Sequence, residues 1–194
     1  MTGLTLQPFL NRYPPSRVQR ADPELLRAYR RVLSESLLDV WEQVGLGQYA
    51  DGLLTLTDPR QYAATLQGWL MRDSPDPDRV PLALSAFGTL LYYRRLSGRD
   101  EDVAYIDTVS SASAVVAWSL DACFNEALCS EGGAEALLAP ELFSECRELH
   151  GPLQPGQIYA YVPALSLGGS ADARHAQPSD ALVHLDMLLQ LAQG

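Results

Sequence analysis

The stretch GLGQYADGLLTLTDP, at positions 45–59, constrains the fold of this chain more than any other. Three glycines within eight residues can take backbone conformations that other residues avoid, so they predict the end of a helix followed by tight turns. Residues 53–57 then alternate between apolar and polar side chains, which is typical of a short strand. Asp58 suits the N-cap of a helix and Pro59 its first position, so together they predict the start of a second helix. A chain that passes so quickly from helix through strand to helix is expected to mix both kinds of structure.

The flanking segments predict the rest of an α+β fold. From Asp22-Pro23 to Val44, apolar residues recur at three- and four-residue steps, which predicts one helix of about five turns that Gly45 ends. Further helices are expected from residue 59 to the turn at 74–79 and at residues 120–129, 134–138, 140–150 and 181–193. Strands are expected in two runs within residues 80–95, with a close backbone approach or a bulge at Phe87-Gly88 between them, and at residues 103–108, 113–118 and 157–162. We therefore predict helices packed on a mixed, largely antiparallel β-sheet.

Composition divides the chain into three regions. Residues 1–21 are rich in proline and arginine and have no sustained period, so we expect an N-terminal arm. Two lobes, 22–110 and 111–194, are expected to share one core because no long flexible linker separates them. The opening residues lack the segments of a signal peptide, and no apolar run approaches about 18 residues. These features favour a cytoplasmic protein that does not bind membranes.

Charge is distributed unevenly along the chain. Its 14 cationic residues are all arginine, and 12 of them precede residue 100. Residues 100–194 carry two arginines against 14 acidic residues, a net charge of −12, whereas residues 1–99 carry a net charge of +2. Such a field repels phosphate and anionic lipid and attracts basic macromolecules over about 8–10 Å. Solubility alone would account for the acidity, but the pattern argues against direct binding of nucleic acid and suits a basic protein partner.

Motifs for catalysis are absent from the sequence. No Gly-x-Ser-x-Gly elbow occurs, and Gly168-Gly169-Ser170 is followed by no lysine, so neither an esterase nor a phosphate-binding loop is predicted. Tyr92, Tyr93 and Tyr105 could stack on bases, but their acidic context favours core or interface roles. We expect a protein that is not an enzyme, that needs no cofactor and that has no small-molecule ligand.

The cysteines and histidines give little support for a metal site. Three cysteines in apolar helical contexts are more typical of buried reduced thiols than of disulfides. Cys146 and His150 stand four apart on one predicted helix and could present two metal ligands, but Cys123 and Cys129, six apart, face different ways. His184 lies among leucines, which favours a hydrogen-bonded packing histidine over a catalytic base. Buried thiols are therefore favoured over a zinc site.

A group of acidic residues is the candidate partner-binding surface. The helix that begins at Pro140 has an apolar inner face that runs from Leu142 to Leu149. On its outer face, three glutamates recur at i, i+4 and i+7. Like charges at this spacing cost a few tenths of a kcal/mol per pair, which Arg147 relieves only in part. A solvated face would explain any single glutamate, but the whole group suits a basic partner. The candidate residues are Asp100, Glu101, Asp102, Glu126, Glu131, Glu135, Glu141, Glu145 and Glu148.

Several short motifs, spread over residues 24–193, together resemble one family of bacterial proteins. They are Trp41, Gly45, Gly47, Tyr49, residues 51–54, Asp58-Pro59, Tyr62, residues 86–88, Ile158-Tyr159, residues 162–165 and 167–169, His184 and the closing Leu-Leu-Gln-Leu. The chain resembles proteins that carry a GAD-like domain, here residues 22–110, followed by a domain first catalogued as of unknown function. One departure is Pro155-Gly156-Gln157, where related proteins often have an acidic residue just before the late strand.

The resemblance implies an immunity function. Many proteins of this kind are immunity proteins of type VI secretion systems paired with DNase effectors, among them Pseudomonas proteins that neutralise a GHH-type nuclease. With the acidity, this predicts a cognate nuclease toxin as the partner and stoichiometric occlusion of its basic surface, because a DNase must carry a positive groove. Distortion of the toxin from another binding site stays open. Two rival classes also stay open: a non-enzymatic acidic binding or adaptor module for another basic protein, and an enzyme that acts on a small molecule in a polar pocket.

Overall fold

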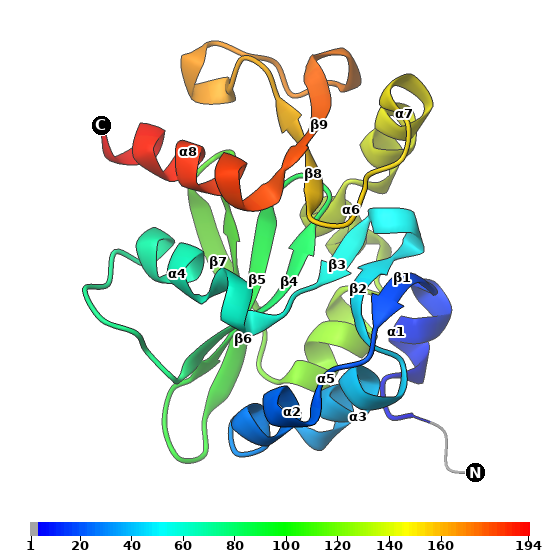
Figure 1. Ribbon diagram of the computed structural model, residues 1–194, viewed down its shortest axis with the longest axis vertical. Coiled ribbons are helices and arrows are strands. Elements are labelled where there is room, and N and C mark those ends of the chain that lie inside the picture. Colours follow the sequence, from blue (N-terminus) through cyan, green and yellow to red (C-terminus); the bar gives the residue numbers. More distant parts are fainter. Residues whose placement is uncertain (1–3) are drawn as a thin grey trace.

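The computed structural model describes residues 4–194, which form helices on both sides of a β-sheet (Figure 1). The helices are α1 (Gln7–Arg12), α2 (Pro23–Tyr29), α3 (Glu35–Gln43), α4 (Pro59–Trp69), α5 (Leu120–Ala122), α6 (Glu131–Leu138), α7 (Pro140–His150) and α8 (Ala181–Gln193). The strands are β1 (Pro15–Gln19), β2 (Leu46–Tyr49), β3 (Leu54–Leu56), β4 (Arg79–Ser85), β5 (Thr89–Arg95), β6 (Glu101–Asp107), β7 (Ala112–Ala117), β8 (Gln157–Tyr161) and β9 (Ala176–Asp180). Shorter helical turns are η1 (Ala50–Gly52), the π-helical η2 (Cys123–Ala127), η3 (Leu165–Leu167) and η4 (Ala173–His175). The predicted α+β class is confirmed.

Seven strands form one sheet in chain order from β1 to β7, and every neighbouring pair is antiparallel. Short connections join four of the neighbouring pairs, as antiparallel pairing allows, whereas α2 and α3 lie between β1 and β2, and α4 lies between β3 and β4. β8 and β9 form a second, two-stranded antiparallel sheet, and the N–H of Tyr159 donates to the carbonyl of Ala86 at 2.8 Å, which ties β8 to the turn between β4 and β5. The expected sheet was mixed and largely antiparallel; the strand pairs within residues 4–194 are all antiparallel.

Successive side chains of β5 point alternately into two separate hydrophobic cores. Leu90 and Tyr92 belong to a smaller core beneath α4 and α8, whereas Leu91 and Tyr93 belong to a larger core on the opposite face of the sheet. Successive side chains of a strand point to opposite faces, which explains the division. The larger core also takes buried side chains from α1, α3, η2, α6 and α7. Both halves of the sequence therefore contribute to one core, and the division into lobes near residue 110 stays a prediction.

The glycine-rich stretch turns as expected and also holds a strand that sequence analysis missed. Gly45 follows α3 with a φ of +132°, and its N–H donates to the carbonyl of Val40 at 2.9 Å. The next residues form β2, which pairs with both β1 and β3. A Cβ on Gly47 would lie 2.3 Å from the carbonyl oxygen of Arg17, so glycine is what lets β1 approach. β2 escaped prediction because a four-residue strand with a central glycine has little β propensity.

Two other local predictions are confirmed. Asp58 caps α4, since its carboxylate accepts a hydrogen bond from the N–H of Arg60 at 2.9 Å. Gly88 has a φ of +90°, and its carbonyl accepts a hydrogen bond from Oγ1 of Thr108 at 3.0 Å. A Cβ on Gly88 would lie 2.9 Å from that hydroxyl, so the expected close approach at Phe87-Gly88 is present, and Thr108, directly after β6, makes it.

The prediction of an N-terminal arm at residues 1–21 is wrong for residues 4–21, and residues 1–3 lie outside the described residues. Leu6, directly before α1, and Phe9, inside it, are fully buried in the larger core. The hydroxyl of Tyr13 donates to the carbonyl of Leu128 at 2.6 Å, which fastens this segment to the C-terminal half. β1 then extends the sheet beyond β2. A helix this short cannot show a sustained period, which is why composition misled the prediction.

Two further differences concern element boundaries. The single five-turn helix predicted from Asp22 to Val44 is two helices, because Ser34 adopts an extended backbone, with φ −66° and ψ 148°, between α2 and α3. Apolar residues continue at helical spacing across this break, so periodicity does not reveal it. β9 was missed because its sequence, AQPSD, is mostly polar and contains a proline.

Candidate functional site

Two consecutive helices, α6 and α7, carry most of the candidate acidic residues. Ser130 caps α6, accepting a hydrogen bond from the N–H of Gly133 at 3.0 Å. Ala139, with a φ of +48°, reverses the chain, and a proline at the next position begins α7. Phe143 and Cys146 then pack into the larger core. This packing leaves the opposite face of α7 in solvent.

The glutamates on these two helices are all exposed. They are Glu131 and Glu135 on α6 and Glu141, Glu145 and Glu148 on α7. Within residues 4–194 none of them forms an ion pair. Arg147, which was expected to relieve their repulsion in part, instead binds the carboxylate of Asp51 at 3.0 Å. Leu149, expected on the inner face of α7, is exposed as well, so the apolar face is narrower than predicted.

Glu126 lies on η2, where the helix predicted at residues 120–129 changes from α to π geometry. The N–H of Leu128 donates to the carbonyl of Cys123 at 2.9 Å, which is the i to i+5 bond of a π turn. Such turns are rare and frequently occur at functional sites. Glu126 is exposed and lines a shallow hollow between η2 and the end of β7.

The three acids of the β5–β6 hairpin do not belong to the same surface. Asp102 is 1% exposed, and its carboxylate accepts two hydrogen bonds from the guanidinium of Arg94, at 2.7 and 2.6 Å. Glu101 is half-buried and accepts a hydrogen bond from the hydroxyl of Tyr93 at 2.9 Å. Asp100 belongs to the connection between β5 and β6. This connection lies at the lower end of the view in Figure 1, whereas α7 lies at the upper right. The expectation that Asp102 would face a partner is therefore wrong, because its charge is already neutralised inside the sheet.

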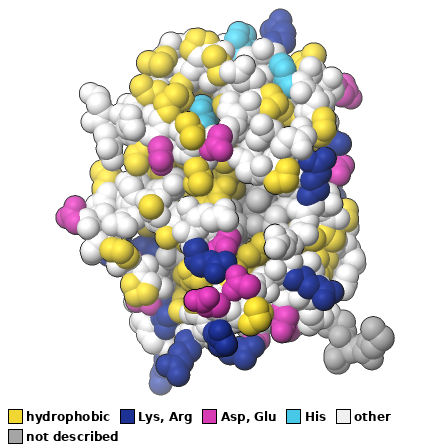
Figure 2. All heavy atoms as spheres, in the orientation of Figure 1, with side chains coloured by type: hydrophobic (Ala, Val, Ile, Leu, Met, Phe, Trp, Pro, Cys, Tyr) yellow, Lys and Arg dark blue, Asp and Glu magenta, His cyan; other side chains and the backbone are white. Residues whose placement is uncertain are grey.

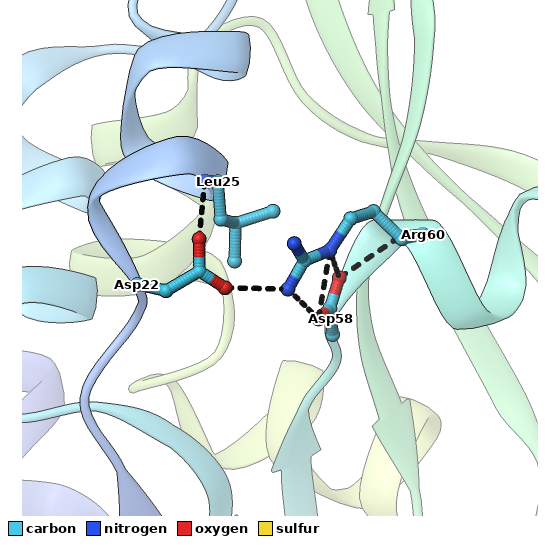
Figure 3. A network of polar contacts seen from close by, with 4 residues as sticks. All are labelled: Asp22, Leu25, Asp58 and Arg60. Carbon is cyan, nitrogen blue, oxygen red and sulfur yellow. Dashed lines mark hydrogen bonds and ion pairs between the residues drawn. The ribbon is translucent and has the colours of Figure 1, made fainter.

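A second polar network joins the starts of two helices and was not anticipated (Figure 3). The guanidinium of Arg60 lies 2.8 Å from the carboxylate of Asp22 and 2.7 Å from that of Asp58. A backbone hydrogen bond from Leu25, followed by the Arg60 interaction, holds the pKa of Asp22 below its ordinary value. Both carboxylates are thus occupied as helix caps and ion-pair partners, which makes the network structural rather than an acid–base pair. Both Asp-Pro sequences predicted the caps, but not that one arginine would link them.

The candidate metal ligands do not come together. Cys146 is buried, and burial raises the pKa of its thiol to about 11, so the thiol is neutral. Nε2 of His150 lies 2.6 Å from the carbonyl of Ala173 and is occupied by that hydrogen bond. In the described part of the chain no three His, Cys, Asp or Glu side chains gather as metal ligands would. His184 is buried on α8, as expected, but its imidazole makes no hydrogen bond within residues 4–194, and burial lowers its pKa.

The face drawn in Figure 2 carries charge of both signs. Arginine and acidic side chains are interleaved over its lower half, around α2 and α4, which agrees with the nearly neutral N-terminal half of the sequence. Tyr92 and Tyr93 are buried in the cores, so neither can serve as a stacking platform. No helix in residues 4–194 has the length and apolar character needed to cross a membrane.

Comparison with known proteins identifies two matching family models. One, described as the GAD-like domain, matches residues 5–106, which is more than half of the chain. The other, described as the C-terminal part of the T6SS immunity protein Tdi1, matches residues 122–192. No curated protein matches the chain. The crystal structure of Atu4351 from Agrobacterium tumefaciens has the same fold, with a TM-score of 0.73 and 21% identity over 95% of this chain and 88% of that one.

Proposed function

The chain belongs to the GAD-like domain family and is an immunity protein of a type VI secretion system, and we propose that the effector it neutralises is a DNase. It binds the toxin one to one and covers the basic surface that holds DNA. It acts in the cytoplasm, where the DNA to be protected lies. Immunity of this kind depends on binding and requires no catalysis.

The observation that carries this proposal is the uncompensated charge on η2, α6 and α7. Six glutamates there are exposed and lack an ion-pair partner within residues 4–194, in a half of the chain with a net charge of −12. A DNase has to hold a backbone that carries one charge per about 1.7 Å, so its substrate groove must be positive. Complementary fields speed the encounter by one to three orders of magnitude, and close packing then slows dissociation.

The test is inhibition of plasmid cleavage by the purified protein. The effector encoded beside this gene is mixed with increasing amounts of the protein, and we expect cleavage to stop at one equivalent. A triple variant, Glu141→Gln, Glu145→Gln and Glu148→Gln, should associate about tenfold more slowly at low salt and show a weaker salt dependence.

A matched control removes the same charge from the other half of the chain. Glu24→Gln, Glu42→Gln and Asp73→Asn alter three exposed acids that form no ion pair in the described structure. This control should associate at nearly the wild-type rate. A neighbouring toxin that binds tightly but does not cleave DNA would favour the alternative of an acidic module for another basic partner. Equal association rates for all three proteins would show that the α7 glutamates do not steer binding.

A further inference from the structure

The two edges of the seven-stranded sheet are protected to very different degrees. β1, at one edge, contains a proline and an arginine, which discourage pairing with another chain. β7, at the other edge, reads ASAVVA and contains neither a charge nor a proline. Within residues 4–194, the backbone of residues 112–118 makes no hydrogen bond beyond its ladder with β6. One whole side of β7 therefore has free N–H and C=O groups.

Large apolar side chains stand beside this free edge. Trp118, directly after β7, is 72% exposed, and Val115 is 40% exposed. A register shift leaves Val116 opposite no residue of β6, and bulges of this kind occur at sheet edges next to functional sites. Val116 and Trp118 line the shallow hollow of about 440 Å³ together with residues from α5 and η2. Tryptophan is one of the residue types enriched in the hot spots of binding interfaces.

The hollow also carries an acidic residue. Glu126, on the π turn, lines the hollow together with the small side chains Ala122 and Ala127. It is exposed and has no basic partner in the described chain. A side chain that enters the hollow therefore meets an indole, two methyl groups and a carboxylate. A long basic side chain satisfies all of these, because its aliphatic stem packs on the apolar atoms and its charge reaches the carboxylate.

We infer that the cognate effector adds an extended, basic segment to the free edge of β7 and inserts an arginine or lysine between Trp118 and Glu126. This inference rests on the proposed function only in taking the effector as the partner. Main-chain hydrogen bonds to β7 supply affinity and the hollow supplies specificity, as in other cases of strand addition. A second copy of this chain is the poorer occupant, because pairing two β7 edges would bring together two halves that each carry a net charge of −12.

The first measurement is the dissociation constant of the full chain with the effector's toxin domain, purified with an inactivating substitution. Trp118→Ala should raise the Kd at least about 30-fold, the effect expected of a hot spot. The control is Val183→Ala, which shortens an apolar side chain of similar exposure, 70%, on α8 and should change the Kd less than about twofold. Both positions are exposed, so both variants should keep the wild-type melting temperature.

The second measurement is hydrogen exchange of residues 112–117 with and without the toxin. Strand addition should slow exchange of the β7 amides, which burial of Trp118 alone would not do. The inference is overturned if Trp118→Ala binds like the wild type, or if exchange in β7 is unchanged in the complex. Slow exchange that appears on raising the concentration of this protein alone would make a second copy the occupant and would also overturn it.

The two proposals can fail separately. If the protein protects the plasmid but Trp118→Ala binds normally and exchange in β7 is unchanged, the proposed function holds and β7 is not the binding surface. If Trp118→Ala weakens binding and exchange in β7 slows, but the toxin does not cut DNA, the result supports β7 as the binding surface and refutes the proposed DNase specificity.

Discussion

Replacement of Asp102 separates charge that stabilises the fold from charge that serves binding. Asp102 and Arg94 are directly paired across β5 and β6, and the carboxylate accepts both hydrogen bonds of the guanidinium fork. The interaction raises the pKa of Arg94, whose guanidinium also lies 6.0 Å from the ring of Tyr92. Asp102→Asn preserves the shape of the side chain but removes the charge. The N–H group of the new amide then faces an N–H group of the Arg94 guanidinium, so one hydrogen bond is lost.

The expected loss follows from the burial of the two partners. Removing one partner of a buried ion pair costs about 3–5 kcal/mol, because the other charge is left without compensation. Arg94 is 26% exposed and can recover some hydration, so we expect the free energy of unfolding to fall by about 2–3 kcal/mol. For a chain of this length each kcal/mol corresponds to about 2–4 °C, so the melting temperature should drop by roughly 4–12 °C.

The assays are urea denaturation followed by circular dichroism and the rate of association with the toxin. Asp102→Asn removes the same unit charge as Glu148→Gln, which should leave stability within about 0.5 kcal/mol of the wild type. We expect Asp102→Asn to unfold at lower urea but, where it is folded, to associate at the wild-type rate. Unchanged stability, or an association rate reduced as much as in Glu148→Gln, would refute this assignment of roles.

Three further predictions concern packing and titration. Gly47→Ala should destabilise the protein by about 2–4 kcal/mol, because its Cβ would lie 2.3 Å from a backbone oxygen at a φ of +125°, whereas Gly98→Ala, with nothing within 4 Å, should be nearly neutral in the same thermal melt. Cys129 should be the only cysteine that iodoacetamide alkylates in the native protein at pH 8, since the other two thiols are buried; mass spectrometry would show one adduct, and three after unfolding. Burial lowers the pKa of His184, so the unfolded chain binds the proton more readily and stability should decline as the pH falls through about 6.5; His184→Gln should flatten this part of the pH–stability curve.

Much of the fold could be predicted because its signals are local. Asp-Pro caps and glycines with positive φ act within a few residues, so α4, the turn at Gly88 and the end of α3 were all found. The errors share a different cause. The N-terminal segment is ordered by distant contacts, such as the hydrogen bond from Tyr13 to Leu128, which no local pattern encodes. β2 and β9 are strands because their neighbours pair with them, and their own sequences have little β propensity.

The candidate surface shows the same limit. Sequence spacing placed Glu141, Glu145 and Glu148 on an exposed face of one helix, and they are exposed. It could not distinguish them from Asp102, because a count of charges does not reveal which acid has an arginine directly across the sheet. Trp118 was also overlooked, because the sequence does not reveal that β7 is an edge strand or that the tryptophan after it is exposed.

The acidic helices and the β7 edge have different physical properties, so they should govern different steps of binding. The field of the glutamates on α6 and α7 extends over about a Debye length and acts before contact, so it should set the association rate and its dependence on salt. Trp118 and the free groups of β7 act only at contact distance, so they should set the dissociation rate. An immunity protein needs both, because a slow encounter leaves time for a few damaging turnovers and a fast escape restores the toxin. Substitutions at the two places should therefore change the two rate constants separately, and their effects on the Kd should multiply as expected for independent sites.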